Sequence, residues 1–273
     1  MKIAVTGCGW YGLALAKVLL QQGHTVIGSK RDSAGCEQLE KEGIQAVALD
    51  LAAEVDALAC APLVDVDAMV VNIPPGLRRG DSDYLGRLQK LKQLMLPNRL
   101  KKLIFISTTG VYPNAGRVSE ADAGVYSTGS ETLLAAEALF LDAPELLSEE
   151  GQVSVLRFAG LVGPGRHPGR FLAGKTGITG GNQSVNLVHL EDCVAATCLL
   201  LDAGRIGSVY NLCTRDHLPK AQFYPLAAAS LGLEPPQFGD DADTDKQVDG
   251  SHICRELNFD YRYKSLIDLL NFC

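Results

Sequence analysis

The chain begins with a glycine-rich turn between an apolar segment and a segment with helical spacing. Lys2-Ile3-Ala4-Val5-Thr6 is followed directly by Gly7-Cys8-Gly9-Trp10-Tyr11-Gly12. Leucine and alanine then recur on one face of a predicted helix over residues 11–22. The pattern G-x-G-x-x-G in a strand–turn–helix context predicts a dinucleotide-binding turn rather than a glycine turn without a ligand.

Each glycine of this turn has its own expected purpose. Gly7 permits the tight turn, Gly9 lets the backbone approach a pyrophosphate, and Gly12 allows close packing of helix on strand. Trp10 and Tyr11 lie where the predicted helix opens, and there free N–H groups and the helix dipole favour an anion. These five residues are the predicted cofactor-binding turn.

The residues after the second predicted strand indicate which dinucleotide is preferred. NAD-binding proteins place an acid there to accept a hydrogen bond from the ribose 2′-hydroxyl. This chain has Ser29, Lys30 and Arg31 instead, and Asp32 comes one or two positions late. Two cations and a hydroxyl suit a 2′-phosphate, which arginine can bind bidentately. Lys30 and Arg31 therefore predict NADP, with NAD as the second choice; the alternative is a solvated pair of surface charges.

Strand and helix patterns alternate through the first 158 residues. Predicted strands cover residues 2–6, 25–27, 46–49, 68–73, 103–106 and 153–158, and predicted helices cover 11–22, 34–42, 83–96 and 131–141. This alternation predicts an α/β fold with a doubly wound, parallel Rossmann sheet. Because ligands bind beyond the carboxyl ends of such strands, Asp50 is expected near the adenine, and Asn72 and Pro74 near the nicotinamide ribose.

The character of the chain changes after Phe158. Residues 160–181 are rich in glycine and predict a long irregular segment of the kind that is usually functional. Regular patterns return at residues 184–188, 191–201, 209–212 and 221–231, and a last helix passes through Leu266, Leu269 and Leu270.

The composition limits the classes of partner. A net charge of −7 gives no clustered positive surface for nucleic acid or for anionic membranes. We expect neither a membrane span nor a secretory signal, because no apolar run is long enough and Lys2 leads straight into the first strand. Eight scattered cysteines without a Cys-x-x-Cys pair predict free thiols and a cytoplasmic location. His189 is not expected to be a metal ligand, and no metal site is expected.

Several motifs in order resemble the extended short-chain dehydrogenase/reductase superfamily, which contains nucleotide-sugar epimerases and dehydratases. They are the Gly7–Gly12 turn, residues 106–112, 156–158, 163–166, 188–192 and 210–212, and they span nearly the whole chain. The resemblance implies a Rossmann domain formed by residues 1–158 with 184–212 returning to it. It implies a smaller C-terminal α/β substrate lobe formed by residues 159–183 and 213–273.

The chain departs from this superfamily at its acid–base pair. The superfamily uses a Tyr and a Lys four residues later, with a Glu about eight residues after the Tyr. With Glu137 as the anchor, these positions fall on Gly129 and Leu133. Tyr126 lies three residues early, and without a cation nearby in sequence a tyrosine is a poor base at neutral pH. Tyr126 therefore remains a candidate base, with an exposed or packing tyrosine as the stronger interpretation.

Other site residues follow from the same resemblance. Thr108 matches the catalytic Ser/Thr that bonds the substrate oxygen, and Ser107 or Thr109 could serve equally. Arg157 and Arg166 flank the glycine-rich segment, which in the superfamily approaches the phosphates of the substrate; a strand-end ion pair is the alternative for Arg157.

Two functions follow. The first is an NADP-dependent oxidoreductase or an epimerase/dehydratase-like enzyme that acts on a small molecule such as a nucleotide sugar, with an altered acid–base group. The second is a non-catalytic NADP(H) sensor or partner-binding protein. A homodimer is compatible with either function.

Overall fold

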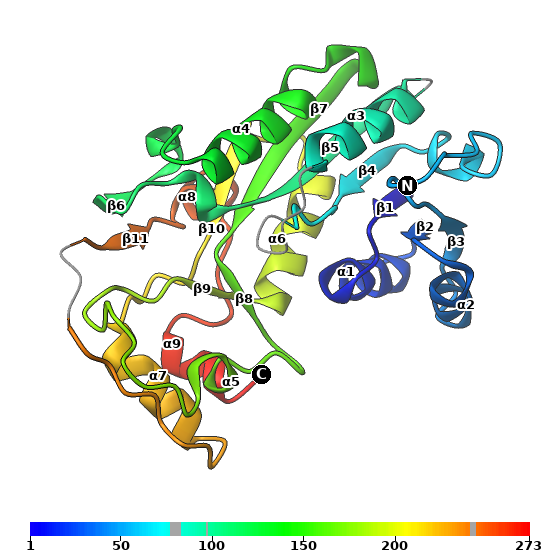
Figure 1. Ribbon diagram of the computed structural model, residues 1–273. Helices are drawn as coiled ribbons and strands as arrows, with labels where there is room; N and C mark the ends of the chain where they lie inside the picture. The colour runs from blue at the N-terminus through cyan, green and yellow to red at the C-terminus, as the bar shows by residue number, and fades with distance from the viewer. Residues whose placement is uncertain (77–82, 97, 241–243) are drawn as a thin grey trace.

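The central feature of the computed structural model is a seven-stranded parallel sheet. The structure describes residues 1–76, 83–96, 98–240 and 244–273. The strands are β1 (Lys2–Thr6), β2 (Thr25–Lys30), β3 (Gln45–Ala48), β4 (Ala68–Val71), β5 (Leu100–Thr108), β7 (Leu147–Phe158) and β10 (Val209–Leu212). Their order across the sheet is β10-β7-β5-β4-β1-β2-β3. Successive strands are added on one side of β1 up to β3 and then on its other side from β4 onward. This strand order is that of the Rossmann fold, as predicted (Figure 1).

Helices cover both faces of this sheet. On one face lie α1 (Trp10–Gln21), α2 (Ser33–Lys41) and α6 (Leu190–Asp202). On the other face lie α3 (Tyr84–Met95) and α4 (Thr128–Leu141) (Figure 1). The strand pleat explains the two layers, because Ile3 and Val5 join the core beneath α1 whereas Ala4 joins the core beneath α3.

A third apolar core lies mostly within residues 159–183 and 213–273, which we call the C-terminal lobe, and it also includes Val185 and Leu187. It packs α7 (Lys220–Ala229) against α9 (Leu266–Leu270) through Phe223, Leu266 and Leu269, all fully buried. The short helix α5 (Gly169–Leu172) lies against α7. Figure 1 shows this lobe beyond the carboxyl ends of the sheet strands, where Rossmann folds bind ligands.

Two short parallel pairs join distant parts of the chain. Strand β8 (Gly160–Val162) pairs with β9 (Leu187–His189), and β6 (Gly116–Val118) pairs with β11 (Lys246–Val248). Short 3₁₀ turns η1 (Ala61–Leu63), η3 (Thr109–Val111), η4 (Glu120–Asp122) and η5 (Pro144–Leu146), and helix α8 (His252–Leu257), complete the elements. No helix within the described ranges is long and apolar enough to cross a membrane.

Most predicted elements are present with shifted ends, and one prediction was wrong. The segment 160–181 was expected to be irregular, but β8 and α5 lie within it. Both elements are very short and are held by partners far along the chain, so local periodicity does not reveal them. The β6–β11 pair was not predicted for the same reason.

Candidate dinucleotide and substrate site

In the Gly7–Gly12 turn, the backbone is packed so closely that Gly7 and Gly12 have no room for a side chain. Gly7 has φ +84°, and a Cβ there would lie 2.2 Å from the Asn72 carbonyl oxygen. A Cβ on Gly12 would lie 2.4 Å from the Gly7 carbonyl oxygen. The Asn72 amide donates to that same oxygen at 2.9 Å, and the Ser29 hydroxyl accepts from the Gly7 N–H at 2.9 Å. Glycine is therefore required at both positions by the protein itself.

Gly9 is different, because nothing in the described protein fills the space beside it. It caps the N-terminus of α1 with φ −74°, and a Cβ there would meet no atom within 4 Å. The first turn of α1 carries no acidic residue that would compete for an anion. A phosphate approaching the backbone would occupy this space, so the residues present fit the pyrophosphate of a dinucleotide.

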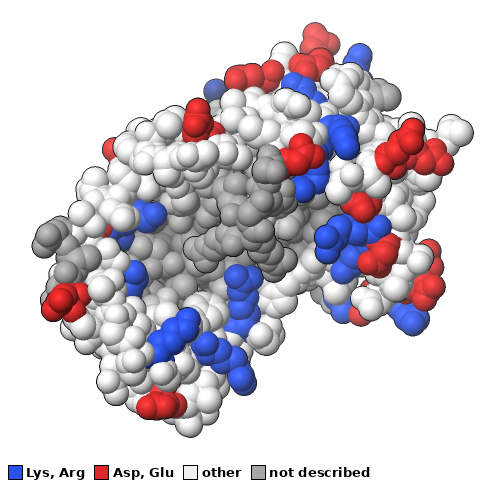
Figure 2. All heavy atoms as spheres, in the orientation of Figure 1, with Lys and Arg blue, Asp and Glu red and all other residues white. Residues whose placement is uncertain are grey.

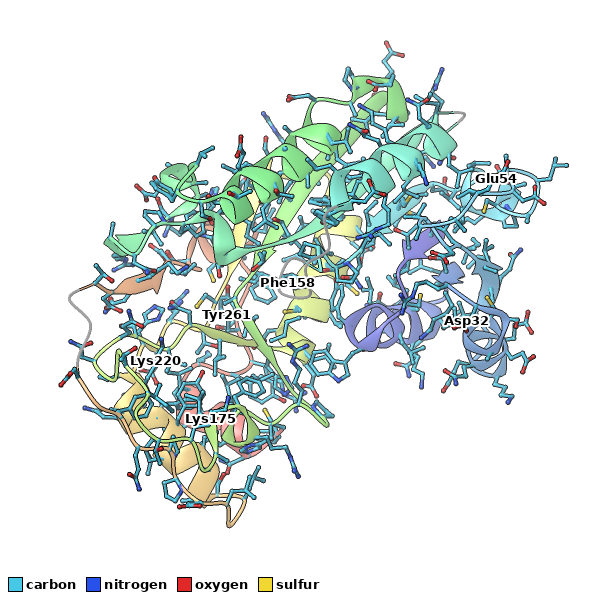
Figure 3. The ribbon with its side chains drawn as sticks, viewed as in Figure 1. Asp32, Glu54, Phe158, Lys175, Lys220 and Tyr261 are labelled. Carbon is cyan, nitrogen blue, oxygen red and sulfur yellow. The ribbon has the colours of Figure 1, made fainter. Side chains whose placement is uncertain are left out.

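The side chains between the glycines have separate surroundings. Burial raises the pKa of the Cys8 thiol to about 12, and its sulfur points inward to the Val5 carbonyl. Tyr11 is also buried, with its hydroxyl 2.7 Å from that of Thr197 and its ring edge-on to Phe158 at the end of β7 (Figure 3). The predicted contact of Tyr11 with a cofactor would therefore come from its backbone N–H.

Trp10 connects the glycine turn to the glycine-rich segment of the C-terminal lobe. Its indole N–H donates to the Pro164 carbonyl at 3.0 Å, and the Arg166 guanidinium lies 5.5 Å from the centre of its ring. The structure thus brings Arg166 beside the first turn of α1.

Two cations, Lys30 and Arg31, lie at the end of β2. Lys30 and Arg31 form no ion pair within the described part of the chain. Asp32 instead caps α2, accepting from the Gly35 N–H at 2.7 Å (Figure 3). The expectation that the Ser29 hydroxyl faces a 2′-phosphate was wrong, because Ser29 is buried and holds Gly7.

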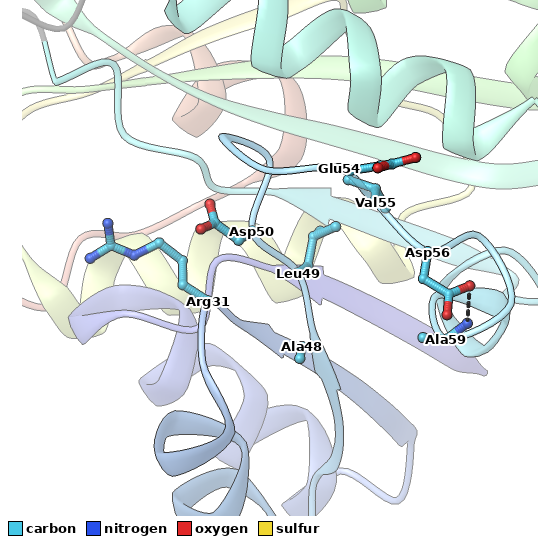
Figure 4. Close-up of a pocket in the computed structure, with 8 residues that line it drawn as sticks. All are labelled: Arg31, Ala48, Leu49, Asp50, Glu54, Val55, Asp56 and Ala59. Carbon is cyan, nitrogen blue, oxygen red and sulfur yellow. Dashed lines mark hydrogen bonds between the residues drawn. The ribbon is translucent and has the colours of Figure 1, made fainter.

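A pocket of about 280 Å³ lies next to Arg31 at the carboxyl end of β3. Figure 4 shows Arg31 and Asp50 at one end of it and Asp56 and Ala59 at the other. The Asp50 carboxylate accepts from the Ala52 N–H at 3.0 Å, which fixes its direction. The charged side chains that line the pocket are the carboxylates of Asp50, Glu54 and Asp56 and the guanidinium of Arg31.

A buried polar network links three adjacent strands, β5, β7 and β10, near their carboxyl ends. The Ser107 hydroxyl donates to Glu137 at 2.6 Å, and the Arg157 guanidinium donates to the same carboxylate at 2.6 Å. Arg157 also donates to the Tyr112 hydroxyl at 2.7 Å, which in turn donates to Asn211 at 2.5 Å. Ser107, Arg157 and Asn211 are neighbours in register, so the sheet itself aligns them.

Two residues of this network, Arg157 and Ser107, were predicted from the sequence to contact the substrate. Arg157 and Glu137 form an ion pair whose side chains are only 5% and 3% exposed. This is the ion pair that the sequence left open as the alternative for Arg157. Burial raises the pKa of Tyr112 to about 12, so its hydroxyl remains a neutral donor. Arg157 and Ser107 are thus committed to internal bonds, and we do not include them among the proposed substrate contacts.

Thr108 keeps its hydroxyl available. It ends β5, is half-buried, and has no side-chain hydrogen-bond partner within the described ranges. Thr109 is buried, and its carbonyl accepts from the Lys246 ammonium at 3.2 Å. Lys246 was not identified from the sequence, since it lies 137 residues away along the chain.

The positions of the missing acid–base pair are occupied by structural residues. Tyr126 is 57% exposed, and its hydroxyl donates to the Asp122 carbonyl at 3.3 Å. Ser130, four residues later, accepts from the Tyr126 N–H at 2.8 Å and forms a capping box with Ser127, the N-cap of α4. Leu133 is buried, and its methyl lies 3.1 Å from where a Cβ on Gly110 would be.

His189 and Asp192 serve the junction with the C-terminal lobe. The His189 ring lies 3.1 Å from the Phe272 carbonyl oxygen and accepts from the Glu191 N–H, and it packs against the Tyr263 ring at an angle of 47°. Asp192 accepts from the N–H groups of Arg262 and Tyr263, and burial raises its pKa to about 6. Both residues are engaged with the backbone, in line with a supporting role.

Comparison with known proteins places this geometry in a family. The model of the NAD dependent epimerase/dehydratase family matches residues 3–213. The protein YeeZ of Escherichia coli K12 is 43% identical over 270 residues, covering 96% of each chain.

Solved structures with low sequence identity share the fold. UDP-glucuronic acid 4-epimerase from Bacillus cereus, in complex with NAD, is 22% identical with a TM-score of 0.80, and the match covers 100% of this chain and 95% of that one. The human epimerase family protein SDR39U1, with NADPH, is 20% identical with a TM-score of 0.73, covering 99% and 98%. The match of the family model across most of the chain shows that the protein belongs to the NAD-dependent epimerase/dehydratase family.

Proposed function

We propose that the chain is an NADP-dependent oxidoreductase or epimerase of this family that acts on a nucleotide sugar. The observation that carries the proposal is the glycine turn facing open space at Gly9, with Lys30 and Arg31 where an NAD-binding protein has an acid. Family membership and the fold shared with NAD and NADPH complexes support it.

The proposed cofactor contacts run along the carboxyl edge of the sheet. Gly7, Gly9, Gly12 and the backbone of Trp10 and Tyr11 would hold the pyrophosphate, as helix N-termini do. Lys30 and Arg31 would bind the 2′-phosphate, and Asp50 would accept a hydrogen bond from the adenine. Asn72 and Pro74, which follow β4, would border the nicotinamide ribose. When bound, the nicotinamide supplies the hydride acceptor or donor.

The proposed substrate lies at Thr108. Its free hydroxyl at the end of β5 can donate a hydrogen bond to a carbonyl oxygen or accept one from an alcohol. Arg166 would contact phosphates on the side of Trp10. Tyr126 is the weakest candidate for a base, because its hydroxyl bonds to a backbone carbonyl of its own loop.

The test of the enzyme proposal is turnover. NADPH or NADP would be incubated with UDP-glucose, UDP-galactose, UDP-glucuronate and small carbonyl compounds, and absorbance at the NADPH band and sugar products would be followed. Turnover that is lost in Thr108→Val is the expected result. Cofactor binding without any turnover across the panel would contradict it.

A non-catalytic NADP(H)-binding protein is the second candidate. The observation that favours it is the replacement of the Tyr-x-x-x-Lys pair by Gly129 and Leu133 in a folded, capped helix. This candidate predicts different affinities for NADP and NADPH, measured by calorimetry, together with no turnover.

A further inference from the structure

We propose that Lys246 binds an anionic group of the substrate beside Thr108, with Lys220 as a second cation. The inference rests on the proposed function, because it takes Thr108 as the place where the substrate reacts. It adds that the substrate presents a carboxylate or phosphate to the C-terminal lobe at this point.

The backbone brings Lys246 from the C-terminal lobe to the end of β5. Lys246 begins β11, which pairs in parallel register with Gly116–Val118 of β6. Its ammonium reaches the Thr109 carbonyl at 3.2 Å. Thr109 directly follows Thr108, so the cation lies one peptide unit from the threonine whose hydroxyl is free.

Both lysines are short of partners. An ammonium has three N–H donors, and the structure gives Lys246 one acceptor, the Thr109 carbonyl, within the described part of the chain. Lys220 starts α7 and donates to the Gln183 amide oxygen at 2.7 Å (Figure 3). Neither forms an ion pair with a carboxylate in the ranges that the structure describes. A half-buried cation without a counter-ion is costly, and an arriving anion removes that cost.

The charges around Lys246 point the same way. Burial lowers the pKa of Lys246, and the charge of Lys220 lowers it further. Cys213, after β10, also faces it, and burial raises the pKa of that thiol so that it stays neutral. The neighbouring Asp245 carboxylate is bonded to Ser184 and Gln247. Lys246 and Lys220 therefore lie here without a salt bridge to a carboxylate in the part of the chain that the structure describes. Figure 2 shows Lys and Arg side chains within the hollow of this face and on the lobe that borders it.

The experiment measures binding to the NADP-saturated protein by calorimetry. UDP-glucuronate and UDP-glucose form a matched pair of probes, because they differ by a carboxylate against a hydroxymethyl group. The variants are Lys246→Met, Lys246→Arg and, as the control, Lys264→Met, whose lysine is exposed and paired with Asp260 at 2.9 Å. Thermal melting checks the fold of each variant.

We expect Lys246→Met to weaken binding at least about tenfold, as removal of one charge from a partly desolvated pair does. Loss confined to UDP-glucuronate identifies the sugar carboxylate as the bound group, and equal loss for both probes identifies the diphosphate. Lys246→Arg should restore part of the affinity, and Lys264→Met should leave it unchanged. The affinity of the wild type should fall as the pH rises and Lys246 loses its proton.

A structural lysine would behave in the opposite way. Melting of Lys246→Met well below the wild type, with unchanged probe affinity per folded molecule, would overturn the inference. Failure of the wild type to bind either probe would overturn it together with the nucleotide-sugar part of the proposed function, while intact NADP binding would leave the cofactor part standing.

Discussion

At the scale of single residues, the three glycines of the motif differ in how closely the rest of the protein packs around them. Gly7 and Gly12 are required by contacts within the protein, since a Cβ at either would lie within 2.4 Å of a backbone oxygen. Gly9 has no such neighbour. This difference separates folding from binding inside one sequence motif, and it can be measured.

Gly9→Ala should therefore act on binding alone, and Gly12→Ala on the fold. We expect Gly9→Ala to change the free energy of unfolding by less than about 1 kcal/mol, the scale of an N-cap change, while NADP affinity falls at least about tenfold. Gly12→Ala should lower stability by about 1–3 kcal/mol, as overpacking does. Urea denaturation and calorimetry measure the two effects; equal stability loss in both variants would contradict the distinction.

At the scale of elements, a buried ion pair joins β7 to α4. Arg157 and Glu137 are both nearly inaccessible, and Ser107 and Tyr112 complete their hydrogen bonds. Removing one partner leaves a buried charge without compensation, which costs far more than the net contribution of the pair.

Glu137→Ala should lower the free energy of unfolding by about 3–5 kcal/mol. Glu137→Ala combined with Arg157→Met should lose less than Glu137→Ala alone, because the orphaned guanidinium is gone. The control, Asp260→Ala, breaks an exposed pair and should cost under about 1 kcal/mol. Denaturant unfolding of the wild type, Glu137→Ala, Arg157→Met and the double variant gives the cycle, and additive losses would count against a coupled pair.

Asp192, in the first turn of α6, should make the free energy of unfolding depend on pH. Asp192 has its folded pKa raised to about 6 from 3.8. Below pH 4 both states are protonated, and between pH 4 and 6 the folded state holds the proton more tightly. Stability from this group is thus lost as the pH rises, by up to about 3 kcal/mol.

Asp192→Asn should remove that pH dependence. The difference in unfolding free energy, wild type minus variant, is expected to fall between pH 4 and 6 and then level off. Urea melts at intervals of half a pH unit measure it. A difference that stays flat over this range would show that Asp192 titrates in the folded state as it does in the unfolded chain.

At the scale of the whole molecule, the sequence predicted what is local or periodic. The strand–turn–helix at Gly7–Gly12 and the alternation of strands and helices predicted the Rossmann sheet, because each depends on neighbouring residues. Strand β8, the β6–β11 pair and the position of Lys246 at Thr109 depend on contacts between residues far apart in the chain. Local pattern has no access to such contacts.

Long-range contacts also explain why Arg157 and Ser107 bond to Glu137, although the sequence predicted that they contact the substrate. Both stand at carboxyl ends of strands, where the sequence pattern predicts ligand contacts, but side-chain direction depends on the facing helix. Glu137 on α4 lies opposite them and draws both inward. The glutamate lies in an otherwise apolar stretch of a helix, and that was the one signal of a buried charge partner in the sequence.

The most direct measurement of the central claim is cofactor selectivity. Calorimetry of wild type, Lys30→Ala, Arg31→Ala and the control Lys41→Ala would use NADP and NAD in parallel. We expect the wild type to bind NADP at least about tenfold more tightly than NAD. Each of the two alanine substitutions should weaken NADP binding and leave NAD binding little changed, and Lys41→Ala should leave both affinities little changed. Equal wild-type affinity for NAD and NADP would contradict it.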